Sequence, residues 1–405
     1  MGGIVNSDCR LLTRIALKNY KSIAACNVSP AQLTFLVGPN GAGKSNFLDA
    51  LRFVADSLRF SIDHALRNRG GIGEVRRRSS GHPTHFTIRL DFRLADRAGY
   101  YAFLVGAKRG AGYDIQREDC WVSSADGEVS PHYYRVESGK VVKRSFPTGP
   151  SAASDRLYLV NASGLDPFRP VFDALSTTGF YNLSPVAIRD PQPPDPGDLL
   201  KRDGSNIASV LAKLDPGVRA DIEDYLSRIV PGVSGVKRVL IGPREILQFR
   251  QNVHGAQHPW RFDAGNISDG TLRACGVLVA LFQGAGRPAS RRSLVGIEEP
   301  QVALHPAAAE ILFDSLRDAA QHTQVLVTSH SPDLLDNDEL PDDSILAVVA
   351  EDGETRIGPL DEVGRSALRD HLYTAGELLR MNQLGPDPAF WDLPAPQLNL
   401  FGPLG

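Results

Sequence analysis

The sequence predicts an α/β protein with a mixed or parallel sheet core, an antiparallel β subdomain and a helical insert. Two observations carry most of this prediction. An apolar strand, a glycine-rich turn and a helix follow one another over residues 32–60, and strand and helix patterns alternate again over 271–328. Such alternation favours a parallel sheet whose faces are covered by helices. Closely spaced strand patterns with short turns between these sections predict an antiparallel meander.

The first part of the chain contains two predicted strands. Residues 11–24 alternate apolar and polar side chains, the pattern of a half-buried strand, and residues 32–37 form a more buried one. A helix is predicted from Ser45 to about Phe60, followed by a loop rich in glycine, arginine and serine over 70–82.

The rest of the chain divides by its patterns. Strands are predicted at 84–94, 100–108, 113–122, about 132–145 and 236–264, a proline-rich connector at 189–200 and a helical section at roughly 205–230. The later alternation has helices at 271–283 and 307–320, strands at 293–298 and 324–328, and an irregular end at 385–405. The predicted domains are an N-terminal lobe (1–94), an inserted β and helical subdomain (95–264), a C-terminal lobe (265–350) and an extension (351–405).

A complete phosphate-loop motif links the 32–37 strand to the following helix. Residues 38–45 read Gly-Pro-Asn-Gly-Ala-Gly-Lys-Ser and match G-x-x-x-x-G-K-[ST] in the strand–loop–helix context that the motif requires. Lys44 would reach the β- and γ-phosphates, Ser45 would ligate Mg²⁺, and the helix N-terminus adds its positive end. The predicted cofactors are therefore ATP and Mg²⁺, and the predicted nucleotide-binding residues here are Gly38, Asn40, Gly41, Gly43, Lys44 and Ser45.

Two adjacent glutamates end a later apolar strand. Residues 294–300 read Leu-Val-Gly-Ile-Glu-Glu-Pro, and paired carboxylates after a buried strand suit a site for metal and water. Glu298 is predicted to hold the Mg²⁺ shell, directly or through water. Glu299 is predicted to position and deprotonate the attacking water as the catalytic base.

Two further motifs flank the glutamates. Ser268-Asp269-Gly270 opens an apolar helix, so Ser268 is predicted to be its N-cap, and the helix N-terminus is a second anion site. An apolar strand delivers His330 to its polar end, where the catalytic role predicted for the imidazole is to hydrogen-bond a γ-phosphate and sense its loss. Taken singly, helix capping and a structural histidine are the alternative explanations.

Together these residues resemble the ABC-type ATPase head of the RecF/SMC-like and OLD-like group of AAA-labelled ATPases, in a stand-alone form without a Toprim domain. The resemblance covers about 11–60 and 265–336. It is carried by Asn19-Tyr20-Lys21-Ser22-Ile23, the phosphate loop, Ser268-Asp269-Gly270-Thr271, Glu298-Glu299-Pro300, Leu304-His305-Pro306 and Thr328-Ser329-His330-Ser331-Pro332.

The resemblance implies a composite site formed by two copies facing head to tail. ATP on the phosphate loop of one copy would be contacted by Ser268 and Gly270 of the other, and the turn at Leu304-His305-Pro306 would cross the interface. The chain is therefore expected to form a homodimer on binding ATP, with a higher assembly left open, and to hydrolyse ATP to ADP and phosphate.

Several residues depart from the family pattern. Asp269 and Thr271 replace two residues of the Ser-Gly-Gly-Gln signature of transporter heads, and Glu298 stands where aspartate is usual. No lid-loop glutamine occurs between Ser45 and Tyr100. These departures predict slow hydrolysis rather than loss of ATP binding. The candidate substitutes for the glutamine are Arg76-Arg77-Arg78 and the loop 70–73, and Asp336-Asn337-Asp338 is predicted to be a polar loop rather than part of a Toprim nuclease.

Two functions agree with these features. The resemblance favours a sensor or switch that controls a separate, nuclease-like effector in bacterial anti-phage defence. The alternative is a RecF-like, DNA-binding ATPase of repair or recombination, because residues 1–110 hold 17 basic and 7 acidic side chains, net +10, against −13 for the rest. The departures argue against a transporter subunit, and a nucleotide-binding scaffold with negligible turnover stays open.

Cysteine content and hydropathy bear on location. The four cysteines are scattered without a CxxC pair, and no apolar run reaches the roughly 18–20 residues of a membrane span. The sequence therefore predicts a cytoplasmic protein with no membrane partner.

Overall fold

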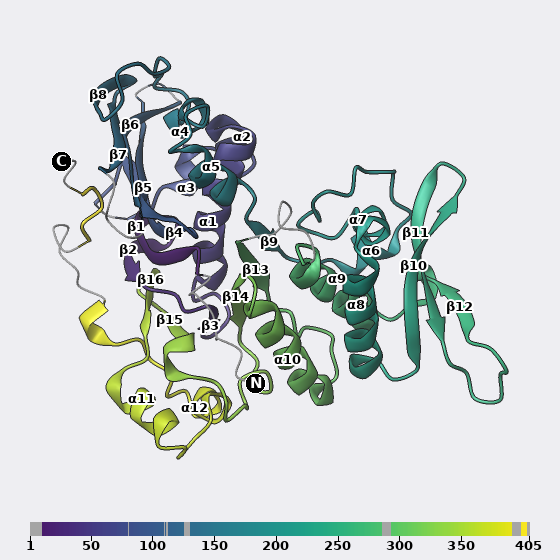
Figure 1. Ribbon diagram of the computed structural model, residues 1–405. Helices are drawn as coiled ribbons and strands as arrows, with labels where there is room; N and C mark the ends of the chain where they lie inside the picture. Colours follow the sequence, from purple (N-terminus) through teal and green to yellow (C-terminus); the bar gives the residue numbers. More distant parts are fainter. Residues whose placement is uncertain are drawn as a thin grey trace. The chain divides into compact units, whose positions relative to one another are not determined.

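The computed structural model describes residues 10–79, 81–108, 110, 112–124, 130–285, 293–390 and 398–402. The chain forms two compact units (Figure 1): the first comprises Met1–Thr178, Pro341–Leu372 and Asn382–Gly405, and the second Gly179–Leu340 and Tyr373–Met381. The phosphate loop belongs to the first unit, and the paired glutamates, Ser268 and His330 belong to the second. The domain boundaries predicted at residues 94, 264 and 350 rest on sequence motifs rather than on packing, and they stay predictions.

The first unit is built on one sheet, in which the described strands follow the order β8-β7-β6-β5-β4-β1-β2-β16-β15-β3. The section from β4 to β8 is the predicted antiparallel meander, and β15 joins β3 in parallel. Its strands are β1 (Leu12–Tyr20), β2 (Ile23–Val28), β3 (Leu33–Val37), β4 (His85–Arg93), β5 (Arg97–Ala107), β6 (Tyr113–Ser124), β7 (His132–Glu137), β8 (Lys140–Arg144), β15 (Ile345–Glu351) and β16 (Glu354–Pro359). Its helices are α1 (Lys44–Arg59), α2 (Ile62–Arg67), α3 (Ile72–Val75), α4 (Tyr158–Ala162), α5 (Arg169–Ser176) and α11 (Glu362–Arg369), with short 3₁₀ turns at Asp342–Ser344 and Pro388–Phe390.

One face of this sheet packs against α1. Phe53 of α1 lies edge-on to Phe86 of β4 and to Tyr20 of β1, with ring centroids 5.4 and 6.1 Å apart. Side chains alternate along a strand, so the next residues of β4 toward this face, Ile88 and Leu90, are also buried, whereas the residues between them point to the other face. The core of the first unit therefore lies between α1 and the inner face of the meander.

An ionisable side chain is buried in that core. Glu118 of β6 accepts hydrogen bonds from the backbone N–H groups of Tyr158 (2.5 Å) and Leu159 (2.8 Å), at the start of α4. It also accepts from the hydroxyls of Tyr101 (3.1 Å) and Tyr134 (2.9 Å). Burial raises the pKa of Glu118 to about 7, and the four donors oppose part of that shift. The carboxyl group fastens α4 to the meander.

The second unit combines a parallel and an antiparallel sheet. Strands β9 (Gly179–Tyr181), β13 (Leu294–Glu298) and β14 (Gln324–Ser329) are parallel, and β10 (Val233–Ile241), β11 (Arg244–Gln251) and β12 (Trp260–Asp263) are antiparallel. Its helices are α6 (Pro185–Arg189), α7 (Ile207–Lys213), α8 (Pro216–Ile229), α9 (Asp269–Phe282), α10 (Ala309–Ala320) and α12 (Ala375–Arg380), with 3₁₀ turns at Ala264–Asn266 and Pro306–Ala308. The strand and helix alternation predicted for residues 271–328 is thus confirmed.

One element prediction is wrong, and the structure divides a second predicted section, which is helical as expected, more finely. Residues 11–24 form the β1–β2 hairpin instead of one strand, because the chain turns where Asn19 and Lys21 take φ values of 56° and 49°. The turn contains neither glycine nor proline, so the alternation of apolar and polar residues continues across it and gives no sign of a turn. The helical section 205–230 is two helices, because Asp215 caps α8 and Pro216 begins it.

The remaining observations concern location and the chain end. Among the described residues, no helix has the length and apolarity needed to cross a membrane. Cys26, Cys120 and Cys275 are buried free thiols, whereas Cys9 lies outside the described residues. Residues 391–397 and 403–405 of the predicted irregular end also lie outside them.

Candidate active site

The phosphate loop lies between β3 and α1, as the sequence predicts. Gly41 and Gly43 have φ values of 80° and 104°, in the left-handed region that favours glycine. A Cβ atom on Gly38 would lie 1.9 Å from the carbonyl oxygen of Val348 in β15. A Cβ atom on Gly43 would lie 2.0 Å from Oγ1 of Thr355 in β16. Neighbouring strands therefore hold the loop at distances that only glycine permits.

A chain of hydroxyl groups also holds the loop in place. Thr355 Oγ1 donates to the carbonyl oxygen of Ala42 at 2.8 Å. Ser22 Oγ lies 2.7 Å from Thr355 Oγ1 and accepts from the Asn46 amide at 2.7 Å. Sequence reasoning missed Thr355, since it is 313 residues from Ala42 and belongs to no motif.

The donors around the loop suit an anion. Lys44 is buried, and its ammonium group donates to the carbonyl oxygens of Gly38 (2.7 Å) and Pro39 (3.1 Å). Helix α1 begins after Gly43, and among the described residues no side chain caps its N-terminus. A Cβ atom on Gly41 would meet nothing within 4 Å, so the loop leaves open space there. These donors fit the phosphates of a nucleotide.

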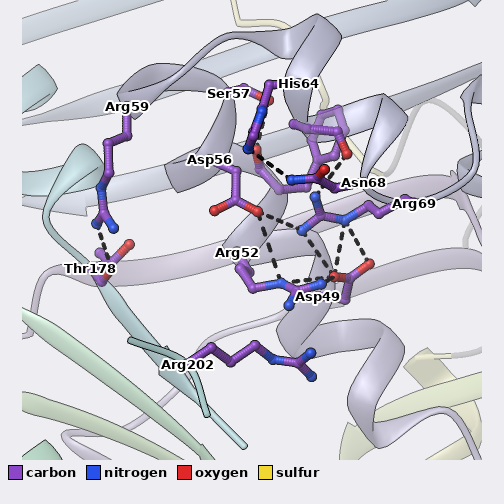
Figure 2. A network of polar contacts seen from close by, with 12 residues as sticks. Asp49, Arg52, Asp56, Ser57, Arg59, His64, Asn68, Arg69, Thr178 and Arg202 are labelled. Atoms are coloured by element: carbon purple, nitrogen blue, oxygen red, sulfur yellow. Dashed lines mark hydrogen bonds and ion pairs between the residues drawn. The ribbon is translucent and has the colours of Figure 1, made fainter. Parts of the chain in front are cut away.

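A cluster of charged side chains holds α1, the helix that follows the loop (Figure 2). Arg52 and Arg69 converge on the Asp49 carboxylate, which also contacts the Lys21 ammonium (2.6 Å) and the Tyr20 hydroxyl (2.9 Å). Burial by itself would raise the pKa of Asp49, but Arg69 and then Arg52 lower it below its usual range. Tyr20 ends β1 and Lys21 follows it in the turn to β2, so this cluster attaches the end of β1 and that turn to α1.

The arginine triplet of the first unit is engaged in contacts of its own. Arg76 donates to the carbonyl oxygen of Pro83 at 2.6 Å, Arg77 pairs with Glu354 at 2.8 Å, and Arg78 pairs with a glutamate of α3. Residues 70–82 are not the continuous loop that the sequence predicts, because α3 occupies Ile72–Val75, and these contacts hold the triplet that follows it. They give no specific support to DNA binding or to a lid-loop role.

In the second unit, parallel strands bring the predicted catalytic residues to one edge. Glu299 follows β13 and His330 follows β14, so both lie at the carboxyl ends of neighbouring strands, where α/β sheets bind ligands. Glu299 Oε2 lies 2.8 Å from His330 Nδ1 and accepts from the Gln301 amide at 2.7 Å. Glu299 has a φ of 46°, which is a strained backbone position for a side chain of this kind. The structure thus joins the predicted base and the predicted sensor in one cluster.

The other glutamate has a counter-ion that sequence reasoning missed. Arg202 Nη2 lies 2.7 Å from Oε1 of Glu298, the predicted metal ligand. Arg202 lies in the segment between α6 and α7, and the backbone N–H of Asn182, directly after β9, donates to its carbonyl oxygen at 3.0 Å. The Glu298 side chain is 15% exposed and the Arg202 side chain 45% exposed, so this pair is open to solvent on one side. A partly exposed carboxylate offers the oxygen ligands that Mg²⁺ prefers.

The predicted N-cap is confirmed: Ser268 Oγ accepts from the Thr271 N–H at 3.3 Å at the start of α9. A Cβ atom on Gly270 would lie 2.3 Å from the carbonyl oxygen of Ala303, so the start of α9 packs on the turn that follows the glutamates. The nucleotide contacts predicted for Ser268 and Gly270 stay predictions.

Arg273 links α9 to the glutamates from within the core. Its guanidinium donates to the backbone carbonyl oxygens of Glu298 (3.1 Å) and Glu299 (3.0 Å). Burial lowers the pKa of Arg273, and the carboxylates of Glu299 and Glu298 oppose part of this shift. A movement of α9 would therefore be transmitted to the backbone that carries both glutamates.

Two other features singled out in the sequence are His305 and the segment Asp336-Asn337-Asp338. His305 is exposed and accepts from the Ala307 N–H at 3.1 Å, and its interface role stays a prediction. Asp336-Asn337-Asp338 is a loop, as predicted, in which Asp336 accepts from the Thr374 hydroxyl at 2.7 Å. Within the ranges described, no three His, Cys, Asp or Glu side chains gather as a metal site.

These features define the class of protein: the fold is that of an ABC-type ATPase head of the SMC/RecF-like group. The chain belongs to the family described as "AAA domain, putative AbiEii toxin, Type IV TA system", whose sequence model matches residues 33–336. The predicted resemblance to ABC-type heads is confirmed by this match.

Two solved structures share the fold at low sequence identity. One is an SmcHead bound to the C-winged helix domain of ScpA, with a TM-score of 0.56 and 13% identity over 87% of this chain and 99% of that chain. The other is an Smc head domain with an extended coiled coil bound to the C-terminal domain of ScpA, derived from Pyrococcus furiosus. Its TM-score is 0.53 and its identity 11%, over 89% of this chain and 99% of that chain. No curated protein matches the sequence.

Proposed function

We propose that this protein binds and hydrolyses ATP, forms a homodimer on ATP, and acts as a switch for a separate effector protein in bacterial anti-phage defence. The observation that carries the ATP-binding part is the phosphate loop, in which neighbouring strands hold Gly38 and Gly43, Lys44 bonds the loop carbonyls, and no side chain of the described residues caps α1. The family description, a putative toxin of a Type IV TA system, supports the defence role. The ScpA complexes of the two similar heads support a separate protein partner.

The residues take complementary roles in this proposal. Lys44 and the first turn of α1 bind the phosphates, and Ser45 and Glu298 hold Mg²⁺, which supplies positive charge to the phosphate oxygens. Glu299 accepts the proton of a water molecule, since Gln301 and His330 fix the direction of its carboxylate. Arg202 has to release Glu298 before that carboxylate can hold a metal ion.

The second copy supplies the remaining anion site. The N-terminus of α9, with Ser268 as its cap, offers backbone N–H groups to a phosphate carried by the other protomer. Because Arg273 ties α9 to the glutamates, docking of the second copy would also adjust the position of Glu299. Hydrolysis would then depend on dimer formation, whereas ATP binding would not.

Phosphate release by Glu299→Gln tests the enzymatic part. We expect this variant to bind ATP as the wild type does and to lose roughly 10²–10⁴-fold in turnover, the usual contribution of a general base. It should also accumulate as a dimer with ATP and Mg²⁺ in size-exclusion chromatography with light scattering. Glu339→Gln, at an exposed glutamate of the same unit, is the matched control. Turnover that survives Glu299→Gln would refute the assignment of the base.

The defence role needs a separate test in cells. With the native gene neighbourhood present, we expect protection from phage that Lys44→Ala abolishes, and an effector that co-purifies with the wild-type chain. A chain that recovers no partner and protects from no phage would reject the switch role and leave the ATPase standing. Hydrolysis that DNA stimulates, with a steep dependence on salt, would favour the RecF-like alternative instead.

A further inference from the structure

The outer face of the meander, opposite α1, carries an unusual set of charges. Arginines on four strands surround two aspartates. Arg14 and Arg89 contact Asp91 at 3.2 and 2.6 Å. Arg117 and Arg135 contact the buried Asp119 at 2.9 and 2.8 Å. We call Arg14, Arg89, Arg117 and Arg135 the arginine row. Glu137 of β7 stands opposite Arg117, so the four arginines face three carboxylates and the row keeps one positive charge in excess.

Residues 398–402, Leu-Asn-Leu-Phe-Gly, lie on the arginine row. Arg14 donates to the carbonyl oxygen of Leu398, and Arg89 donates to that of Asn399 at 2.8 Å. Arg135 donates to the carbonyl oxygen of Gly402 at 3.2 Å. Three members of the row thus recognise main-chain atoms, which every peptide offers.

Two side chains of the segment add selectivity. Leu398 is 1% exposed, and the ring of Phe401 lies against the guanidinium of Arg117, 4.1 Å from its Cζ atom. Phe401 also packs with Tyr100 and Trp121 on the same face. This face therefore recognises a leucine and a phenylalanine three positions apart.

The segment leaves the charge of the face unbalanced. Residues 398–402 contain no ionisable side chain, so the excess positive charge of the arginine row has no counter-ion in them. A hollow of about 370 Å³ beside Asn399 and Phe401 is also lined by Lys18 and His85. A ligand with the same backbone contacts and a carboxylate in this hollow would fit the face better than the chain's own segment does.

We propose that the arginine row is a peptide-docking site, that residues 398–402 occupy it within the same chain, and that an extended peptide of a partner protein displaces them. The partner peptide carries leucine and phenylalanine three positions apart and an acidic residue beside them. A nucleic acid fits this face less well, because Asp91 and Asp119 stand among the arginines and would repel phosphates. The proposal does not depend on ATP hydrolysis.

The test uses the full chain and a fluorescein-labelled peptide of residues 396–405. In the tail variant, Leu398→Ser and Phe401→Ser together remove both side-chain anchors without adding charge. We expect the tail variant to bind the peptide, measured by fluorescence anisotropy, at least about tenfold more tightly than the wild type, whose tethered segment competes at an effective concentration on the order of mM. The same peptide with Asn399→Asp, at a position that lines the hollow, should bind the tail variant more tightly still.

A second substitution locates the binding surface. Arg117→Lys, made in the tail variant, keeps the positive charge beside Asp119 but loses the planar group that stacks on Phe401. It should weaken peptide binding roughly two- to fivefold, the range of an exposed cation–π contact. Arg156→Lys, at an exposed arginine of the same unit, is the matched control, and melting temperatures verify that all variants fold.

Three results would overturn the proposal. The first is a folded tail variant that does not bind the peptide, and the second is equal binding by wild type and tail variant. The third is salt-sensitive binding of a labelled oligothymidylate to the tail variant that the peptide does not displace, which would assign the face to nucleic acid.

Discussion

The phosphate loop and the paired glutamates are held in different ways. Around the loop, Gly38 lies against a backbone carbonyl group of β15 and Thr355 of β16 bonds the loop through a buried hydroxyl, so these two contacts cannot rearrange without moving the strands. Around the glutamates, the buried Arg273 holds the backbone, but the carboxylates pair with side chains nearer the surface: Arg202 is 45% exposed and His330 is 40% exposed. Exposed ion pairs contribute only about 0–1 kcal/mol each, so these contacts can be exchanged.

This difference suggests a division of labour between the two units. A loop fixed by backbone contacts binds its ligand without a further ordering cost, which favours affinity. Carboxylates held by exchangeable counter-ions can respond to a metal ion or to a second protein copy. The first unit would therefore determine whether ATP is bound, and the second unit would determine when it is hydrolysed.

Gly38→Ala tests the rigidly held phosphate loop and has the largest expected effect. Its Cβ atom would lie 1.9 Å from the Val348 carbonyl oxygen, a backbone atom that cannot move aside. We expect a loss of about 3 kcal/mol or more in the free energy of unfolding, at the upper end for overpacking, together with loss of ATP binding. Thermal unfolding and a fluorescent ATP analogue measure the two effects. Gly73→Ala, where the new Cβ meets nothing within 4 Å, should leave both unchanged.

Glu118 gives the first unit a predicted pH dependence. Its folded pKa of about 7 exceeds the ordinary value of 4.5, so between these pH values the unfolded chain is ionised while the folded chain keeps the proton. The contribution of Glu118 to stability is then complete below about pH 4.5 and is lost as the pH rises through about 7, a decrease on the order of 3 kcal/mol. Urea denaturation from pH 4.5 to 8 should show this decrease in the wild type and a flatter curve for Glu118→Gln. Parallel curves would refute it.

Arg202→Gln tests the exchangeable contacts of the paired glutamates and has the smallest expected effect. Without the arginine, the ion pair that has to open before Glu298 holds a metal ion is gone, so half-maximal hydrolysis should need roughly two- to fivefold less Mg²⁺, as expected for an exposed ion pair. Arg228→Gln, which removes an exposed pair with Asp314 in the same unit, is the control. A Mg²⁺ requirement that does not change, or that rises, would show that Arg202 does not compete with the metal.

Local patterns account for what could be predicted from the sequence. The strand–loop–helix around Lys44, the antiparallel meander and the N-cap at Ser268 each depend on residues close together in the chain, and each is confirmed. The ABC-type class followed from the order of the motifs rather than from any one of them.

The missed features depend on distant contacts. Thr355 reaches Ala42 across 313 residues and Arg202 reaches Glu298 across 96, and neither lies in a recognisable motif. The turn at Lys21 was missed for a different reason, because residues with side chains adopt backbone angles that usually indicate glycine. Arg202 is brought to Glu298 by the backbone contact with Asn182, directly after β9, which no local pattern predicts.

The most direct test of the central claim measures ATP binding and hydrolysis per protomer while the protein concentration is raised from the monomeric range. The account predicts that ATP affinity stays constant, because one copy holds a complete phosphate loop, and that the hydrolysis rate per protomer rises as dimers form. A hydrolysis rate per protomer that does not change across the range in which the protein passes from monomer to dimer would contradict it.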